Sequence, residues 1–266
     1  MLSVETFSTL SAAAGAMSGR ARYLAGGTLV MRDVNYGAHG IDRILRTTDS
    51  DLRQIRSEGP RIRIGAGATM SDIIASPDLG ALAPAARAIG GPAIRNMATV
   101  GGNLFAPHPY GDFATALLAL DAEVQWTDGR SELLESFLTR RDSATGLVAA
   151  VSIPRISAGE FRFAKVSRTR PKGVSVMSIA AWLPGGPSRL GDPRIAFGAM
   201  GPTPLRAKAT EAALAGASLD ENGIARALEV CTEGLAPVDD PLASAWYRNA
   251  VASVHLKRLL LQERRV

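Results

Sequence analysis

The sequence predicts an α+β protein in which short α/β units are followed by a separate C-terminal α+β domain. Strand-like and helix-like segments alternate up to Pro154, and two glycine turns interrupt this first part. After Pro154, longer strand candidates come first and a run of helices follows. Strands followed by helices are typical of an α+β domain or of separate domains. We therefore expect the boundary between residues 153 and 160.

The first part is expected to begin as a small α/β unit. Hydrophobic spacing predicts a helix over 9–17, a strand over 22–24, an amphipathic stretch with Leu29, Val30 and Val34, and a strand over 41–45. Between 54 and 67, apolar and charged residues alternate on both sides of a Glu-Gly-Pro turn, which predicts a hairpin.

The remaining elements follow in the same way. Before Pro154 we expect helices over 70–75, 79–89 and 112–120, a strand pair over 123–127 and 130–134, and a strand over 148–153. After Pro154 we expect strands over 161–168, 175–182 and 194–200, then helices over 205–214, 223–231 and 243–261. The last helix is expected to pack on its own domain.

Two paired-glycine turns, one at 25–28 and one at 99–103, favour an anion-binding function. A pyrophosphate needs several converging backbone N–H donors, and the absence of side chains at paired glycines lets it approach them. Thr28, Thr99 and Asn103 add hydroxyl and amide groups. Either pair alone is more often a plain turn or a packing point. The P-loop pattern is absent, and the stretch from Gly65 to Met70 is only a weak echo of the Rossmann fingerprint.

Composition limits the chemistry of the chain itself. Cys231 is the one cysteine, so this chain cannot build an intrachain disulfide or a cysteine-ligated iron–sulfur cluster. The three histidines lack paired-ligand spacing, and no metal site is expected. The net charge of +5 does not indicate nucleic-acid binding, because the basic clusters lack interleaved aromatic residues. Neither a leader nor a transmembrane run is evident, so a cytoplasmic location is expected.

Several stretches together resemble the FAD-binding medium subunit of the xanthine dehydrogenase and aerobic carbon monoxide dehydrogenase family, the molybdenum hydroxylases. They are LAGGT, RIRIGAGAT, AIRNMATVGGNL with Pro109 and Asp112 after it, VSIP, FRFAKVSR and WYRNAV, in the family's order. The stretch around IRNMATVGGN is the most specific of them.

The resemblance implies a vanillyl-alcohol-oxidase-type (PCMH-type) FAD-binding fold of two α/β subdomains, at 1–55 and 56–157, and a C-terminal domain of the CO dehydrogenase flavoprotein type at 158–266. It also implies an FAD site in which backbone donors of the first glycine turn bind the pyrophosphate and the second turn grips the other side. Asp112 would bind the adenosine half, and Lys165 would lie near the flavin ring. The implied cofactor-binding residues are Leu24, Ala25, Gly26, Gly27, Thr28, Leu29, Ile89, Thr99, Val100, Gly101, Gly102, Asn103, Asp112 and Lys165.

Each side chain also has a structural interpretation. Asp112 is a favoured residue for an N-cap, Lys165 could be an exposed strand residue, and Ile89 could be a core residue. His108 invites a proton-transfer role, but a lone loop histidine is more often a surface contact. Cys231 is expected to be an inert core residue. Leu29 departs from the family, which usually has an acidic or small polar residue there, but backbone donors do not depend on that side chain.

The implied function is electron transfer, with no catalytic residue on this chain. A large molybdopterin-binding subunit would hydroxylate the substrate, and a small subunit with [2Fe-2S] clusters would pass electrons to the FAD held here. The FAD would deliver them to an external acceptor, in a complex expected to be a dimer of heterotrimers. Two alternatives are a stand-alone FAD oxidoreductase, which needs an acid or base near the flavin, and a basic binding protein without flavin, which predicts strongly salt-dependent binding.

Overall fold

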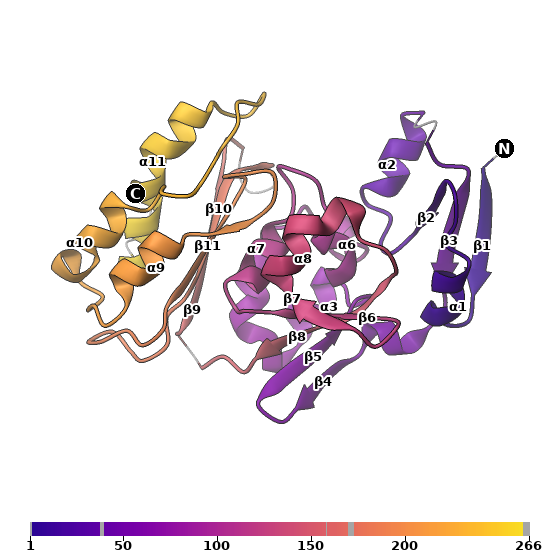
Figure 1. The fold of residues 1–266 in the computed structure, drawn as a ribbon, viewed down its shortest axis with the longest axis horizontal. Coiled ribbons are helices and arrows are strands. Elements are labelled where there is room, and N and C mark those ends of the chain that lie inside the picture. Colours follow the sequence, from indigo (N-terminus) through magenta and orange to yellow (C-terminus); the bar gives the residue numbers. More distant parts are fainter. Residues whose placement is uncertain (1, 38–39, 158, 170–172, 263–266) are drawn as a thin grey trace.

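The computed structural model describes residues 2–37, 40–157, 159–169 and 173–262. Three sheets follow one another along the long axis of the molecule, and each is built from one stretch of the chain (Figure 1). In the described part of the chain, no helix has the length and apolar character needed to cross a membrane. That part also contains no group of His, Cys, Asp and Glu side chains able to hold a metal ion.

The N-terminal sheet has three parallel strands in the order β1-β3-β2. Its elements are β1 (Ser3–Phe7), α1 (Leu10–Gly15), β2 (Ala21–Tyr23), α2 (Val30–Asn35) and β3 (Arg43–Thr47). The expected helices and strands of this region are present with shifted ends, whereas β1 was not predicted. Most β1 side chains are exposed, so the strand lacks an apolar alternation, and only its pairing with the distant β3 defines it.

The middle sheet has five antiparallel strands in the order β4-β5-β8-β6-β7. They are β4 (Ile55–Glu58), β5 (Arg61–Gly65), β6 (Glu123–Trp126), β7 (Ser131–Leu133) and β8 (Val148–Pro154). The α-helices around it are α3 (Met70–Ala75), α4 (Ala83–Arg87), α5 (Pro92–Arg95), α6 (Val100–Leu104), α7 (Asp112–Leu118) and α8 (Leu134–Arg140), and the 3-10 helices are η1 (Ser50–Arg53), η2 (Pro77–Leu82) and η3 (Arg141–Ser143).

Both predicted strand pairs of this sheet are confirmed, β4 with β5 and β6 with β7. The single helix predicted over 79–89 is wrong, because the chain forms η2 and then α4 there. Pro84 lies in the first turn of α4. Proline has no N–H to donate and suits a helix start better than a helix interior, which explains the division.

The C-terminal sheet is antiparallel with the order β12-β11-β10-β9. Its strands are β9 (Phe161–Ser167), β10 (Ser175–Trp182), β11 (Arg194–Gly198) and β12 (Leu205–Arg206), and the helices that follow are α9 (Lys208–Leu214), α10 (Glu221–Glu229) and α11 (Ala245–Leu261). The expected helix over 205–214 begins later, because Leu205 and Arg206 pair with β11.

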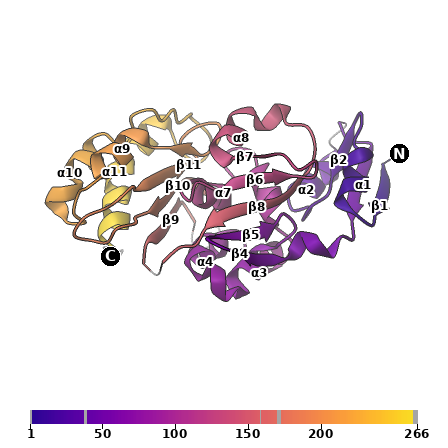
Figure 2. The same cartoon turned by 60° about the horizontal axis from the view of Figure 1, so that its bottom comes forward.

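This sheet lies between two helical layers (Figure 2). Helices α9 to α11 share a core with Met177, Ile179 and Ala181 on one face, which confirms that α11 packs on its own domain. On the other face α7 packs so closely that a Cβ at Gly198 would lie 2.4 Å from the Thr115 Oγ1 atom. The middle and C-terminal sheets therefore share one continuous packed region.

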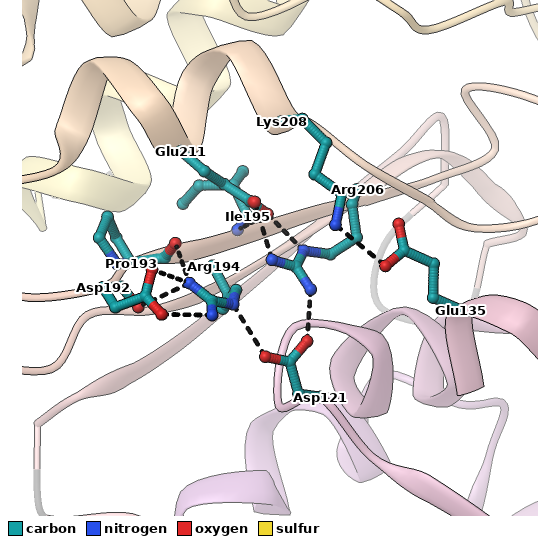
Figure 3. A network of polar contacts seen from close by, with 9 residues as sticks. All are labelled: Asp121, Glu135, Asp192, Pro193, Arg194, Ile195, Arg206, Lys208 and Glu211. Carbon is teal, nitrogen blue, oxygen red and sulfur yellow. Dashed lines mark hydrogen bonds and ion pairs between the residues drawn. The ribbon is translucent and has the colours of Figure 1, made fainter. Parts of the chain in front are cut away.

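A charged network joins these two parts of the chain (Figure 3). Asp121 follows α7 with a φ of 46° and accepts hydrogen bonds from Arg194 of β11, at 2.8 Å, and from Arg206 of β12. Arg206 also pairs with Glu211 of α9. One carboxylate therefore connects the end of α7 to two strands of the C-terminal sheet.

Candidate functional site

The first glycine turn presents a run of unbonded backbone donors. It joins β2 to α2, and the N–H of Leu24 anchors it to the carbonyl of Leu45 at 2.7 Å. The next five N–H groups donate to no other residue in the described ranges; they belong to Ala25, Gly26, Gly27, Thr28 and Leu29. Backbone N–H groups need acceptors, so this turn has the donor set that an anionic ligand requires.

The second glycine segment is a helix rather than the expected turn. It forms the start of α6, with Thr99 as N-cap accepting the Gly102 N–H at 3.1 Å. The N–H groups of Val100 and Gly101 donate to the carbonyls of Ala68 and Ala66, at 2.9 and 2.8 Å. Because these backbone donors are already engaged, the segment offers a ligand mainly its side chains.

The amide of Asn103 is the most available of these side-chain groups. Its Oδ1 atom accepts the N–H of Ala114 at 2.8 Å, which fixes the side chain against α7. The Nδ2 group then points its two donors away from that bond. The Thr99 hydroxyl can donate as well, since the Gly102 N–H uses it only as an acceptor.

The two glycine segments lie against each other. A Cβ at Gly26 would fall 1.7 Å from the carbonyl oxygen of Met97, and one at Gly102 would fall 3.7 Å from the Cβ of Ala25. No side chain fits the first of these gaps, so Gly26 is required by the approach of the two segments. Residues 25–29 and 99–103 thus lie side by side, although 69 residues of sequence lie between them.

Asp112 of α7 and Lys165 of β9 form a second polar group. The Lys165 Nζ atom lies 2.9 Å from the Asp112 carboxylate and donates to the Ala88 carbonyl, also at 2.9 Å. The hydroxyl of Ser175 donates to Asp112 at 2.6 Å. Asp112, which the resemblance assigns to the adenosine half, and Lys165, which it assigns to the flavin ring, are therefore in direct contact.

The structural interpretations of these two side chains are wrong. Gly111, with a φ of 103°, is the N-cap of α7, and Asp112 is the first residue of the helix with its carboxylate turned toward Lys165. The Lys165 side chain is only 13% exposed. Ile89 follows Ala88, which binds Lys165 through its carbonyl, and packs partly buried against the core of the middle sheet.

His108 was expected to be a surface contact, but it joins two domains. Its Nε2 atom lies 2.9 Å from the carboxylate of Asp240 and its Nδ1 atom 3.2 Å from the Gly201 carbonyl. The fully buried Arg248, from the WYRNAV stretch, donates to Asp240 at 2.7 Å. Burial raises the pKa of Asp240, but the hydrogen bonds from His108, two backbone N–H groups and Arg248 outweigh it and lower this pKa to about 2.

Tyr110 is a residue near the site that sequence reasoning missed. Its hydroxyl accepts a hydrogen bond from Arg32 of α2 at 3.0 Å, and the guanidinium lies 5.5 Å from the ring centroid. This contact connects α2, which follows the first glycine turn, to the loop between α6 and α7, which follows the second glycine segment. The two residues are 78 positions apart, and no motif links them.

Comparison with known protein families decides the identity of this arrangement. Residues 2–156 match the FAD-binding domain of molybdopterin dehydrogenases. The chain belongs to this family. Residues 162–263 of this family member match the C-terminal domain of CO dehydrogenase flavoproteins. The expected resemblance and fold class are therefore confirmed, and the chain is part of an oxidoreductase family with an FAD-binding domain.

Relatives of this FAD-binding family member agree with the family match. The carbon monoxide dehydrogenase medium chain of Hydrogenophaga pseudoflava is 27% identical over 79% of this chain and 77% of its own length. The xanthine dehydrogenase FAD-binding subunit of Escherichia coli O157:H7 is 27% identical over 91% and 88%. A solved structure of the Hydrogenophaga pseudoflava carbon monoxide dehydrogenase superposes with a TM-score of 0.87 at 25% identity, covering 97% of this chain and 96% of that one.

Proposed function

We propose that this chain binds FAD with its pyrophosphate against the backbone N–H groups of residues 25–29 and serves as the electron-transfer subunit of a molybdenum hydroxylase. This proposal rests on the run of five N–H groups that have no acceptor in the described chain. The turn that carries them packs against Met97 through Gly26. A pyrophosphate supplies several acceptor oxygens, so it suits this donor set.

The other predicted site residues would contact other parts of the FAD. The Nδ2 group of Asn103 and the hydroxyl of Thr99 would donate to the ligand from the opposite side. Asp112 would accept from a ribose hydroxyl with the lone pairs that Ser175 and Lys165 leave. Lys165 would place a positive charge close to the flavin, from the position where its Nζ atom contacts Asp112 and the Ala88 carbonyl. Bound FAD supplies the chemistry of accepting electrons singly and passing them on as a pair.

We infer two partner subunits, because this chain lacks the groups for the other redox steps. It has one cysteine, and Cys231 is buried in the core of the C-terminal domain, so an iron–sulfur cluster must lie elsewhere. A large molybdopterin-binding subunit and a small [2Fe-2S] subunit fit the curated relatives that are named medium chains. In this proposal the complex is a dimer of heterotrimers that delivers electrons to an external acceptor.

The test is an FAD titration of the full chain and three variants, in which binding is measured by fluorescence quenching. Gly26→Ala introduces a Cβ in conflict with the Met97 carbonyl, and we expect at least about a tenfold loss of affinity for each lost charge-assisted hydrogen bond to the pyrophosphate. Gly15→Ala is the matched control, because a Cβ there meets nothing within 4 Å. Asn103→Asp keeps the acceptor for Ala114 and adds a negative charge, so it weakens binding without a packing conflict.

Equal FAD affinity in Gly26→Ala and Gly15→Ala would contradict the assigned pyrophosphate site. The electron-transfer role is tested separately by purifying the chain with its co-expressed partners and recording the absorption spectrum. FAD together with iron–sulfur absorption supports the complex. Flavin bleaching by a small substrate without any partner would replace this proposal with the stand-alone oxidoreductase.

A further inference from the structure

A cavity of about 550 Å³ lies beside β9, the edge strand of the C-terminal sheet, away from the glycine segments. Helix α4 borders it on one side and the last two turns of α11 on the other. Its walls carry basic and apolar groups: Arg162, Lys165, His255 and Arg258 with Phe161, Phe163, Ala164, Leu259, Pro84, Ala88 and Gln262. The described residues that line it include no carboxylate. The volume is typical of a small-molecule site.

Arg162 is the central group in this cavity. Its guanidinium donates to the carbonyls of Leu259 and Leu260 at the end of α11, and no described carboxylate pairs with it. Its Nε atom is buried without a hydrogen-bond partner in the described chain. Buried donors are normally paired, and a half-buried cation without a counter-charge is unfavourable. Burial accordingly lowers the pKa of Arg162.

Arg258 supplies a second guanidinium to the same space. It lies in the last turn of α11, is exposed, and its side chain makes no hydrogen bond or ion pair with a described residue. Its neighbour Lys257 is turned away and pairs with Glu221 at 2.7 Å. Two guanidinium groups at one cavity can bind the oxygens of a phosphate or carboxylate with charge-assisted hydrogen bonds.

We propose that this cavity binds a small organic oxyanion, a phosphate or carboxylate on an apolar body, between Arg162 and Arg258. The oxyanion compensates the charge of Arg162, and the apolar part lies against Phe161, Phe163 and Leu259, which line the cavity. The cavity shares Lys165 with the assigned FAD site, but none of residues 24–29 or 99–103 lines it, and neither Arg162 nor Arg258 belongs to that site.

Calorimetric titration of the full chain with inorganic phosphate and with phenyl phosphate tests this proposal, with saturating FAD present to block the glycine segments. We expect phenyl phosphate to bind more tightly than inorganic phosphate. Arg258→Gln is expected to weaken both by at least about tenfold, which corresponds to the loss of one charged hydrogen bond. Lys257→Gln, the matched control, removes the same charge from the same helix and is expected to change affinity less than about twofold.

Arg162→Gln is the second variant, checked by its thermal unfolding, since Arg162 also binds the end of α11. A folded Arg162→Gln chain that binds phenyl phosphate like the unsubstituted one would overturn the proposal. Equal losses in Arg258→Gln and Lys257→Gln would also overturn it, because they would indicate only a general attraction to the basic surface.

Discussion

Lys165 of β9 and Asp112 of α7 form an ion pair of 2.9 Å between the C-terminal sheet and the helix that covers it. Their side chains are 13% and 9% exposed. The Ser175 hydroxyl donates to Asp112, and Lys165 donates to the Ala88 carbonyl. Breaking a buried pair of this kind is strongly destabilising, because removal of one partner leaves the other charge buried without compensation.

Lys165→Met is therefore expected to lower the free energy of unfolding by about 3 kcal/mol, because the Asp112 carboxylate stays buried. The double variant Lys165→Met with Asp112→Asn is expected to lose less than the sum of the two single variants. Urea unfolding measures all three. Arg226→Gln is the control: its pair with Glu229 is 70% and 65% exposed, so a loss of less than about 1 kcal/mol is expected. Strict additivity would show that the pair is not coupled.

The low pKa of Asp240 predicts a loss of stability in acid. The carboxylate has a pKa of about 2 in the folded chain, against an ordinary value of 3.8, so the folded state favours its charged form. The stabilisation is complete above pH 4 and disappears as the pH falls through 2. We expect its size to be roughly 1–2 kcal/mol. In Asp240→Asn, the free energy of unfolding should change less between pH 5 and pH 2, and an unchanged slope in that variant would contradict the assignment.

Asp121 is expected to stabilise the contact between α7 and the C-terminal sheet. Asp121→Asn removes the charge that faces Arg194 and Arg206 but keeps a residue type that tolerates the φ of 46°. We expect a loss of about 1–2 kcal/mol, because the Asp121 side chain is 37% exposed and Arg206 retains Glu211. Thermal unfolding measures it. No change in Asp121→Asn would mean that backbone packing alone holds this junction.

Cys231 is expected to be unreactive in the folded protein. Burial raises the pKa of its thiol to about 11, against an ordinary value of 9.0, so very little thiolate exists at neutral pH. A colorimetric thiol reagent should therefore modify Cys231 less than one tenth as fast in buffer as in denaturant. Comparable rates in the two conditions would show that the end of α10 opens readily.

The helices and strands that depend on local sequence were largely predictable. The hairpin of β4 and β5 follows from alternating residues around a Glu-Gly-Pro turn, and α3 from its helical spacing. The structure adds a capping box in which Thr69 and Asp72 close the start of α3. Pro84 shows the limit of this reasoning, since hydrophobic spacing continued across a point where the helix had to restart. Strand β1 shows another limit, because its partner β3 begins about forty residues later and its own side chains are mostly exposed.

The sequence by itself determined the family, the paired glycines and the absence of cysteines for a cluster in this chain, because each is a property of residue type and spacing. Only the tertiary structure decided which N–H groups remain free. It bonds those of Val100 and Gly101 to the strand–helix turn before α3, and among the described residues it gives those of Ala25 to Leu29 no acceptor. It also brought Asp112 to Lys165, and Arg162 to the end of α11. Such contacts depend on how sheets and helices pack across long sequence separations, which local spacing does not encode.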